Sequence, residues 1–110
     1  MQTSEARAAE ARAPDPDQAT RPKLIFFHSV LDGRSRRVAG FLAQILQRRR
    51  NHATFTLYRV AREERPDLLD RFRVERVPTL CVVEGKRMCG RLEVPRGCRD
   101  IERFLAPWLR

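Results

Sequence analysis

The chain has 110 residues, which is enough for one domain with a single core and too few for two domains of ordinary size. Its formal net charge is +9, and residues 1–20, with two arginines and four carboxylates, carry −2, so that the rest of the chain carries +11. The three cysteines have neither a CxxC nor a zinc-site spacing, which excludes a disulfide-built secreted domain, and no apolar run approaches the roughly 20 residues of a membrane span.

The composition also limits the partners to expect. A strongly positive surface attracts polyanions, acidic proteins or anionic membranes. Of the 23 basic residues 21 are arginines, which is typical either of an anion-binding surface or, as we favour, of a general composition bias. The charge by itself does not choose among these partners, and we expect a cytoplasmic protein without metal, cofactor or membrane. Nucleic acid is the less favoured partner, and the oligomeric state is left open.

The first half of the chain predicts a tail, a strand and a helix. Residues 1–22 contain no large apolar residue after Met1, which is typical of a disordered tail, so the domain is expected over residues 23–110. The apolar run Lys23–Ser29 has the length of a strand that is covered on both faces. Apolar residues then recur at helical spacing from Ser35 to about Arg50. They are Val38, Phe41, Leu42, Ile45 and Leu46.

The second half predicts strand, helix, hairpin and helix. Residues 54–60 alternate as a strand does, and Pro66 begins a short helix with proline in its first turn. Residues 79–92 form two strand-like runs joined by a tight turn at residues 84–86. In residues 98–109 the apolar side chains have helical spacing again, which predicts a closing helix with Trp108 on its buried face. The order is βαβαββα.

Two stretches resemble the thioredoxin family. "FRVERVPTLCVVEGKRM" is similar to the family's short helix, its Val-Pro-Thr turn and its penultimate strand, and "LIFFHSVLDGRSRRVAGFLAQIL" resembles its first strand, active-site turn and long helix. The resemblance implies a cis-proline at Pro78. Together with the right-handed crossover rule, it predicts an α/β thioredoxin-like fold whose mixed four-stranded sheet has the order 2-1-3-4 and helices on both faces.

The resemblance places "DGRS" at the family's CxxC motif, so the two cysteine positions are occupied by Asp32 and Ser35. Thiol–disulfide exchange needs a thiolate, which neither a carboxylate nor a hydroxyl replaces. The family's buried carboxylate falls on Phe26, and its tryptophan before the motif falls on Leu31. We therefore expect the ordinary dithiol chemistry to be absent and assign no catalytic residue.

The turn before the long helix is the main candidate site. We favour a helix-capping role for Asp32 or Ser35. Alternatively, Asp32 belongs to a peptide-binding groove, whose residues would be Leu31, Asp32, Gly33, Arg34, Val77 and Pro78. The basic residues of this turn are either an anion site or, as we favour, a solvated face. They are Arg34, Arg36 and Arg37.

The histidines and cysteines offer weaker candidates. His28 ends the first strand and either titrates near the groove or, as we favour, is a packed histidine; neither it nor His52 has a metal-ligand spacing. A three-residue hairpin loop would place Cys81 opposite Cys89, which allows a disulfide, although we favour two reduced thiols. Cys98 begins the last helix and is the one cysteine we consider a candidate reactive thiol.

Three functions follow. The leading hypothesis is a redox-inactive thioredoxin-like protein that serves as a protein-binding, peptide-binding or chaperone-like module. The alternative is a noncanonical thiol oxidoreductase or thiol sensor that uses Cys98, or Cys81 with Cys89. The third is nucleic-acid binding through an arginine-rich face that includes Arg48, Arg49 and Arg50, which lacks interleaved aromatic residues.

Overall fold

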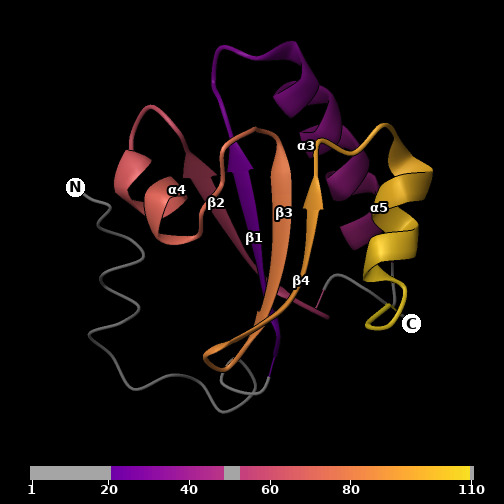
Figure 1. Cartoon of the computed structure of the whole chain (residues 1–110). Coiled ribbons are helices and arrows are strands. Elements are labelled where there is room, and N and C mark those ends of the chain that lie inside the picture. The colour runs from indigo at the N-terminus through magenta and orange to yellow at the C-terminus, as the bar shows by residue number, and fades with distance from the viewer. Residues whose placement is uncertain (1–20, 49–52, 110) are drawn as a thin grey trace.

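The computed structural model describes residues 21–48 and 53–109, in which strands and helices follow one another as predicted (Figure 1). The elements are β1 (Lys23–His28), α3 (Gly33–Leu46), β2 (Thr56–Ala61), α4 (Pro66–Arg71), β3 (Thr79–Glu84), β4 (Arg87–Glu93) and α5 (Cys98–Leu105). Most of the predicted tail lies outside the described residues. At its end, the carbonyl of Pro22 accepts a 3.0 Å hydrogen bond from the main-chain N–H of Thr56, so the folded part includes this residue.

The sheet has the order β2-β1-β3-β4, which confirms the predicted order 2-1-3-4. Strand β1 pairs in parallel with β2 and antiparallel with β3, and β3 pairs antiparallel with β4. A parallel neighbour requires a crossover connection, and α3 supplies it between β1 and β2.

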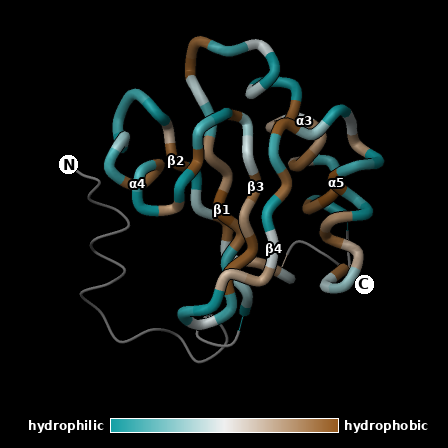
Figure 2. Tube along the Cα trace, in the orientation of Figure 1, coloured by the Kyte–Doolittle hydropathy of each residue, from teal (hydrophilic) through white to brown (hydrophobic). Residues whose placement is uncertain are grey.

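Strand β1 lies at the centre because both of its faces are apolar. Leu24 and Phe26 point into one core cluster, and Ile25 and Phe27 point into the other. All four are buried, since successive side chains of a strand point to opposite faces of the sheet. Figure 2 shows β1 and its neighbour β3 as largely hydrophobic along their length.

Helices cover both faces of the sheet, as predicted. The apolar stripe of α3 packs with α5 on the first face, through Val38, Leu42, Ile45, Ile101 and Leu105. On the second face, Leu69 of α4 and Val74 after it complete the other cluster. No helix in the described part of the chain is long and apolar enough to cross a membrane.

The closing helix is shorter than predicted. It ends at Leu105, and Trp108 lies in the following turn, where its main-chain N–H donates to the carbonyl of Leu105 at 2.9 Å. Pro107 accounts for the difference, because a proline lacks the N–H that the next turn of helix needs. Trp108 still packs on Phe104 and on Phe55, with ring centroids 6.4 and 6.2 Å apart.

The predicted hairpin register is wrong. The turn consists of Gly85 and Lys86 alone, and Gly85 adopts a φ of 63°, which glycine tolerates best. The pairing then shifts by one residue and skips Cys89, so that Cys81 lies opposite Arg91. The expected cross-strand pair of Cys81 and Cys89 is therefore not formed, and both cysteines are free.

Candidate functional site

The turn between β1 and α3 is built around an aspartate cap. The carboxylate of Asp32 accepts hydrogen bonds from the main-chain N–H groups of Arg34 (3.4 Å) and Ser35 (3.1 Å), and from the hydroxyl of Ser35 (3.1 Å). Desolvation alone would raise the pKa of Asp32, but these hydrogen bonds outweigh it and hold the pKa below its ordinary value. The capping role predicted for Asp32 is therefore confirmed, and α3 begins at Gly33, two residues earlier than predicted.

A second set of hydrogen bonds ties this turn to the loop after β2. Ser35 is buried and its hydroxyl accepts the main-chain N–H of Ser29 at 3.1 Å. The hydroxyl of Ser29 donates to the carboxylate of Glu63, which also accepts the N–H of Val30 at 3.2 Å. The hydrogen bond from Ser29 is the largest cause of a lowered pKa at Glu63. These contacts fix the backbone of the turn from both sides.

Two apolar side chains project from the turn into solvent. Leu31 is 82% exposed and Val30 is 55% exposed. At the top of Figure 2 the turn shows a short hydrophobic segment followed by hydrophilic residues. Single exposed apolar side chains are common on protein surfaces. Here two consecutive residues are exposed, and hydrogen bonds hold the backbone that carries them.

The other predicted groove residues, Val77 and Pro78, lie at the same end of the central strands as the turn. Phe27 of β1 pairs with Thr79 of β3, so the turn that follows β1 and the segment that precedes β3 leave the sheet side by side (Figure 1). In that segment, the Val77–Pro78 peptide bond is cis. The sheet topology thus brings residues 30–34 and residues 77–78 to one end of the molecule.

The remaining positions around the turn carry packing roles. Phe26 is buried, and its ring stacks on that of His28 with centroids 5.0 Å apart. Burial, followed by the nearby charge of Arg59, lowers the pKa of His28, which favours the neutral ring. The packed-histidine interpretation of His28 fits this arrangement. His52 lies outside the described residues, and within residues 21–48 and 53–109 no group of acidic, histidine or cysteine side chains is arranged to hold a metal ion.

The three cysteines lie on β3, on β4 and at the start of α5, and none belongs to the turn itself. Cys81 is buried, and desolvation raises the pKa of its thiol. Desolvation also raises the pKa of Cys89, as does its 3.3 Å hydrogen bond to the carboxylate of Glu84. Cys98, at the start of α5, is partly buried against the core cluster on the α3 side of the sheet. Cys81 and Cys89 thus have the opposite of the lowered pKa that marks a reactive thiol.

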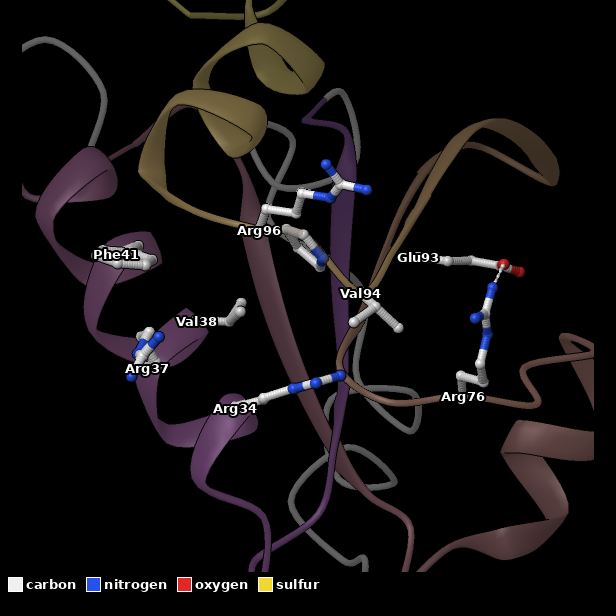
Figure 3. Close-up of a pocket in the computed structure, with 9 residues that line it drawn as sticks. Arg34, Arg37, Val38, Phe41, Arg76, Glu93, Val94 and Arg96 are labelled. Carbon is white, nitrogen blue, oxygen red and sulfur yellow. Dashed lines mark hydrogen bonds and ion pairs between the residues drawn. The ribbon is translucent and has the colours of Figure 1, made fainter.

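A pocket of about 510 Å³ opens beside the turn, and we call it the arginine pocket (Figure 3). Its basic lining residues come from three segments and are Arg34, Arg37, Arg76 and Arg96. Its apolar lining residues are Val38, Phe41, Val94 and Pro95, and Glu93 completes the wall. The structure thus joins two of the three arginines predicted at the turn with two others.

Sequence reasoning missed Arg76, Val94 and Arg96. Arg76 directly precedes Val77 and the predicted cis-proline, and its place in the chain could have drawn attention to it. Arg96 is close to the turn only through the path of the β4–α5 connection, for which the sequence holds no local signal. Arg36 does not line the pocket, and Arg49 and Arg50 of the predicted basic face lie outside the described residues.

Comparison with known proteins identifies the fold. No protein-family model and no curated protein matches the sequence. Among solved structures, Trxlp from Edwardsiella tarda has a TM-score of 0.74 at 17% identity, over 93% of this chain and 93% of the other. Thioredoxin O2 from Arabidopsis thaliana has a TM-score of 0.72 at 15% identity, over 96% and 86%.

A further structural relative is desulfothioredoxin from Desulfovibrio vulgaris Hildenborough, with a TM-score of 0.68 at 21% identity over 83% of this chain and 85% of the other. The chain therefore has the thioredoxin-like fold that the resemblance predicted. Similarity at such identities defines the arrangement of the backbone, whereas an activity depends on the particular side chains at a site.

Proposed function

We propose that this chain, a thioredoxin fold with Asp32 and Ser35 in the turn before α3, is a redox-inactive module that binds an extended segment of a partner protein, as a chaperone-like or adaptor protein does. The proposal rests chiefly on the exposure of Leu31, which is 82%. Its binding surface consists of the exposed turn, residues 30–34, and the adjoining, partly buried Val77. We call it the turn surface. Pro78, the other residue predicted for the groove, has a fully buried side chain, so a partner would not contact it directly.

Burial of Leu31 would contribute substantially to such binding. Removing a fully exposed leucine side chain from water stabilises a complex by roughly 1.5–3 kcal/mol. Val30, which is 55% exposed, adds to the same apolar area. The backbone beneath them is already held by the hydrogen bonds of Glu63 and Asp32, so that little conformational entropy is lost when a partner binds.

The side chains of the turn favour binding over dithiol exchange. Asp32 and Ser35 use their polar atoms to cap α3 and to hold the N–H of Ser29. Neither the carboxylate of Asp32 nor the hydroxyl of Ser35 is a sulfur nucleophile, and thiol–disulfide exchange requires a thiolate to attack a disulfide. Of the free cysteines, Cys81 is buried and Cys98 is partly buried. Reduced cysteines are typical of cytoplasmic proteins, and we place this protein in the cytoplasm.

Selection from a library of random dodecapeptides displayed on phage tests the proposal. The wild-type chain is expected to enrich extended peptides with an apolar residue near their centre. Leu31→Asp should weaken binding of the enriched peptides by about tenfold or more, since a buried leucine is replaced by a charge. Met88→Asp is the matched control, because Met88 is an exposed apolar side chain of the hairpin at the other end of the sheet.

Two results would overturn the proposal. One is the absence of any enriched peptide whose binding survives Met88→Asp and is lost on Leu31→Asp. The other is a fast-reacting thiol in the native protein whose substitution abolishes peptide capture. In that case the thiol oxidoreductase or sensor, which we regard as the alternative function, would take the place of the binding module.

A further inference from the structure

On the basis of the proposed function, we propose that the arginine pocket gives the turn surface its selectivity, and that the partner is an acidic segment in which an apolar side chain is flanked by carboxylates. The pocket lies beside that surface and shares Arg34 with it. A peptide that covers Leu31 and continues along α3 would therefore reach the pocket.

Four arginines that are distant in sequence line this one pocket. Arg34 and Arg37 lie on the first turns of α3, Arg76 precedes the cis-proline, and Arg96 follows β4. In Figure 3, Arg34 extends from α3 across the pocket toward Val94 on the opposite wall. A ligand that fills this pocket would therefore lie against basic side chains from three segments of the chain.

Most of this positive charge is not neutralised within the described residues. Arg76 forms an ion pair with Glu93 at 3.3 Å, and Glu93 is also 3.7 Å from Arg91. By contrast, no carboxylate of the described residues forms an ion pair with the guanidinium group of Arg34, Arg37 or Arg96. A planar guanidinium matches a carboxylate or a phosphate through two parallel hydrogen bonds, so these three arginines favour an acidic ligand.

The pocket also has an apolar part, which distinguishes its ligand from a bare anion. Phe41 and Val94, which are partly buried, contribute apolar surface to the pocket, and the other two apolar lining residues, Val38 and Pro95, are buried. The main chain holds Val94 in place at this wall of the pocket. Its N–H donates to the carbonyl of Pro78 at 2.8 Å, and its φ is 46°, which is unfavourable for a β-branched residue. An apolar side chain with carboxylates on both sides complements this combination of charge and apolar surface.

The surroundings favour a peptide over a nucleic acid. Non-specific binding of single strands combines basic grooves with aromatic side chains on which bases stack. The exposed large apolar residues of the described chain are Val30, Leu31 and Met88, none of which is aromatic. Phe41, the one aromatic residue of the pocket, is half-buried. The adjoining surface thus suits aliphatic side chains.

Fluorescence anisotropy with two labelled peptides tests the inference. The peptides SELESELE and SQLQSQLQ have the same apolar residues and nearly the same shape, and they differ in charge. The acidic peptide is expected to bind the full chain at least about tenfold more tightly at low salt, since several weak ion pairs add up to this ratio. The preference should shrink as sodium chloride rises from about 0.05 to 0.5 M, because salt screens the attraction.

Paired variants locate the selectivity. Arg37→Gln with Arg96→Gln, which changes the pocket and leaves the turn surface as it is, should weaken binding of SELESELE by about tenfold and leave SQLQSQLQ within twofold. Lys86→Gln with Arg87→Gln removes the same charge at the hairpin, at the far end of β4, and should change neither by more than twofold. Both variants replace exposed residues, so circular dichroism should show them folded.

Each other outcome is decisive. Equal binding of the two peptides, or equal losses in the two double variants, overturns the acidic preference and leaves the binding module of the previous section intact. If neither peptide binds while library-selected peptides do, the acidic preference is again wrong. If no peptide of any kind binds, the proposed function itself fails. Tighter binding of a twelve-nucleotide oligothymidylate than of SELESELE would assign the pocket to nucleic acid instead.

Discussion

The hydroxyl of Ser35 accepts a 3.1 Å hydrogen bond from the main-chain N–H of Ser29 in the buried interior of the turn. The bond connects the residue after β1 to the first turn of α3. The hydroxyl of Ser35 therefore has a structural role, because it holds the end of β1 to the start of α3.

Ser35→Ala should therefore destabilise the protein. The substitution leaves the N–H of Ser29 without its acceptor in a buried place, and an unsatisfied buried donor costs about 1–3 kcal/mol. Urea denaturation should show this loss in the free energy of unfolding. Arg36→Ala, at an exposed position of the same helix, is the control, and equal effects of the two substitutions would contradict the role given to the hydroxyl.

The charge of Asp32 should make stability depend on pH. Desolvation acts to raise its pKa, but the hydrogen bonds from Ser35 and Arg34 hold it below the ordinary value of 3.8. A carboxyl whose pKa is lower in the folded chain stabilises the fold above the unfolded pKa, and this contribution is lost as the pH falls through the folded pKa.

Asp32→Asn isolates this charge, because asparagine also caps helices. The wild type should be more stable than the variant near pH 6, and the difference should decrease as the pH falls below about 4. Thermal unfolding at several pH values measures it. A difference that stays constant between these pH values would show that the cap acts without its charge.

Two glycines should respond to alanine in opposite ways. Gly40 lies within α3, and an added Cβ would meet no atom within 4 Å. Gly40→Ala should raise the free energy of unfolding by about 0.5–1 kcal/mol, since glycine is a poor helix former. At Gly90 of β4 the added Cβ would lie 3.0 Å from the ring of Phe104, so Gly90→Ala should destabilise. Urea midpoints that shift in the same direction would contradict this pair of predictions.

Trp108 should anchor the end of the chain even though it lies outside α5. Its ring packs on Phe55 and Phe104, and its Nε1–H donates to the carboxylate of Glu84 at 2.8 Å. Trp108→Ala should lower the free energy of unfolding by up to about 3–5 kcal/mol, the range for a large core aromatic. Trp108→Phe should cost less, because it keeps most of the ring contacts. A thermal midpoint for Trp108→Ala within error of the wild type would show that the turn after Leu105 does not contribute.

Restoring two sulfurs at the turn should create redox activity. The unmodified chain is expected not to accelerate the reduction of insulin by dithiothreitol. With Asp32→Cys and Ser35→Cys combined, a thiolate at the start of α3 is stabilised by the helix dipole, and the second thiol can close a disulfide. The double variant should exceed the parent and both single variants, although buried Phe26 offers no proton acceptor. Activity in the unmodified chain that survives replacement of its three cysteines by serine would contradict this account.

Much of the fold follows from local patterns in the sequence. Within Lys23–His28 the residues Leu24–Phe27 are apolar at consecutive positions, as is typical of a strand covered on both faces, and β1 is central for that reason. The helical spacing of Val38, Leu42 and Ile45 and the position of Asp32 before them predicted α3 and its cap. Each of these features depends on residues that are close together in the sequence, so the sequence alone is enough to predict it.

The hairpin register and the arginine pocket depend on contacts that no local pattern encodes. A two-residue turn and the skipped pairing of Cys89 place Arg91 opposite Cys81, where its guanidinium reaches the carbonyls of Phe72 and Arg73 at the end of α4. The pocket likewise exists only because the order of the strands brings three connections to one place.

The amino-acid sequence by itself thus determined the elements and the central strand, since each depends on side-chain pattern along the chain. Only the tertiary structure decided that Arg34, Arg76 and Arg96 face one pocket beside an exposed Leu31. The physical reason is that charges far apart in sequence meet through the packing of the sheet, and that packing is set by the apolar core beneath them rather than by the charges themselves.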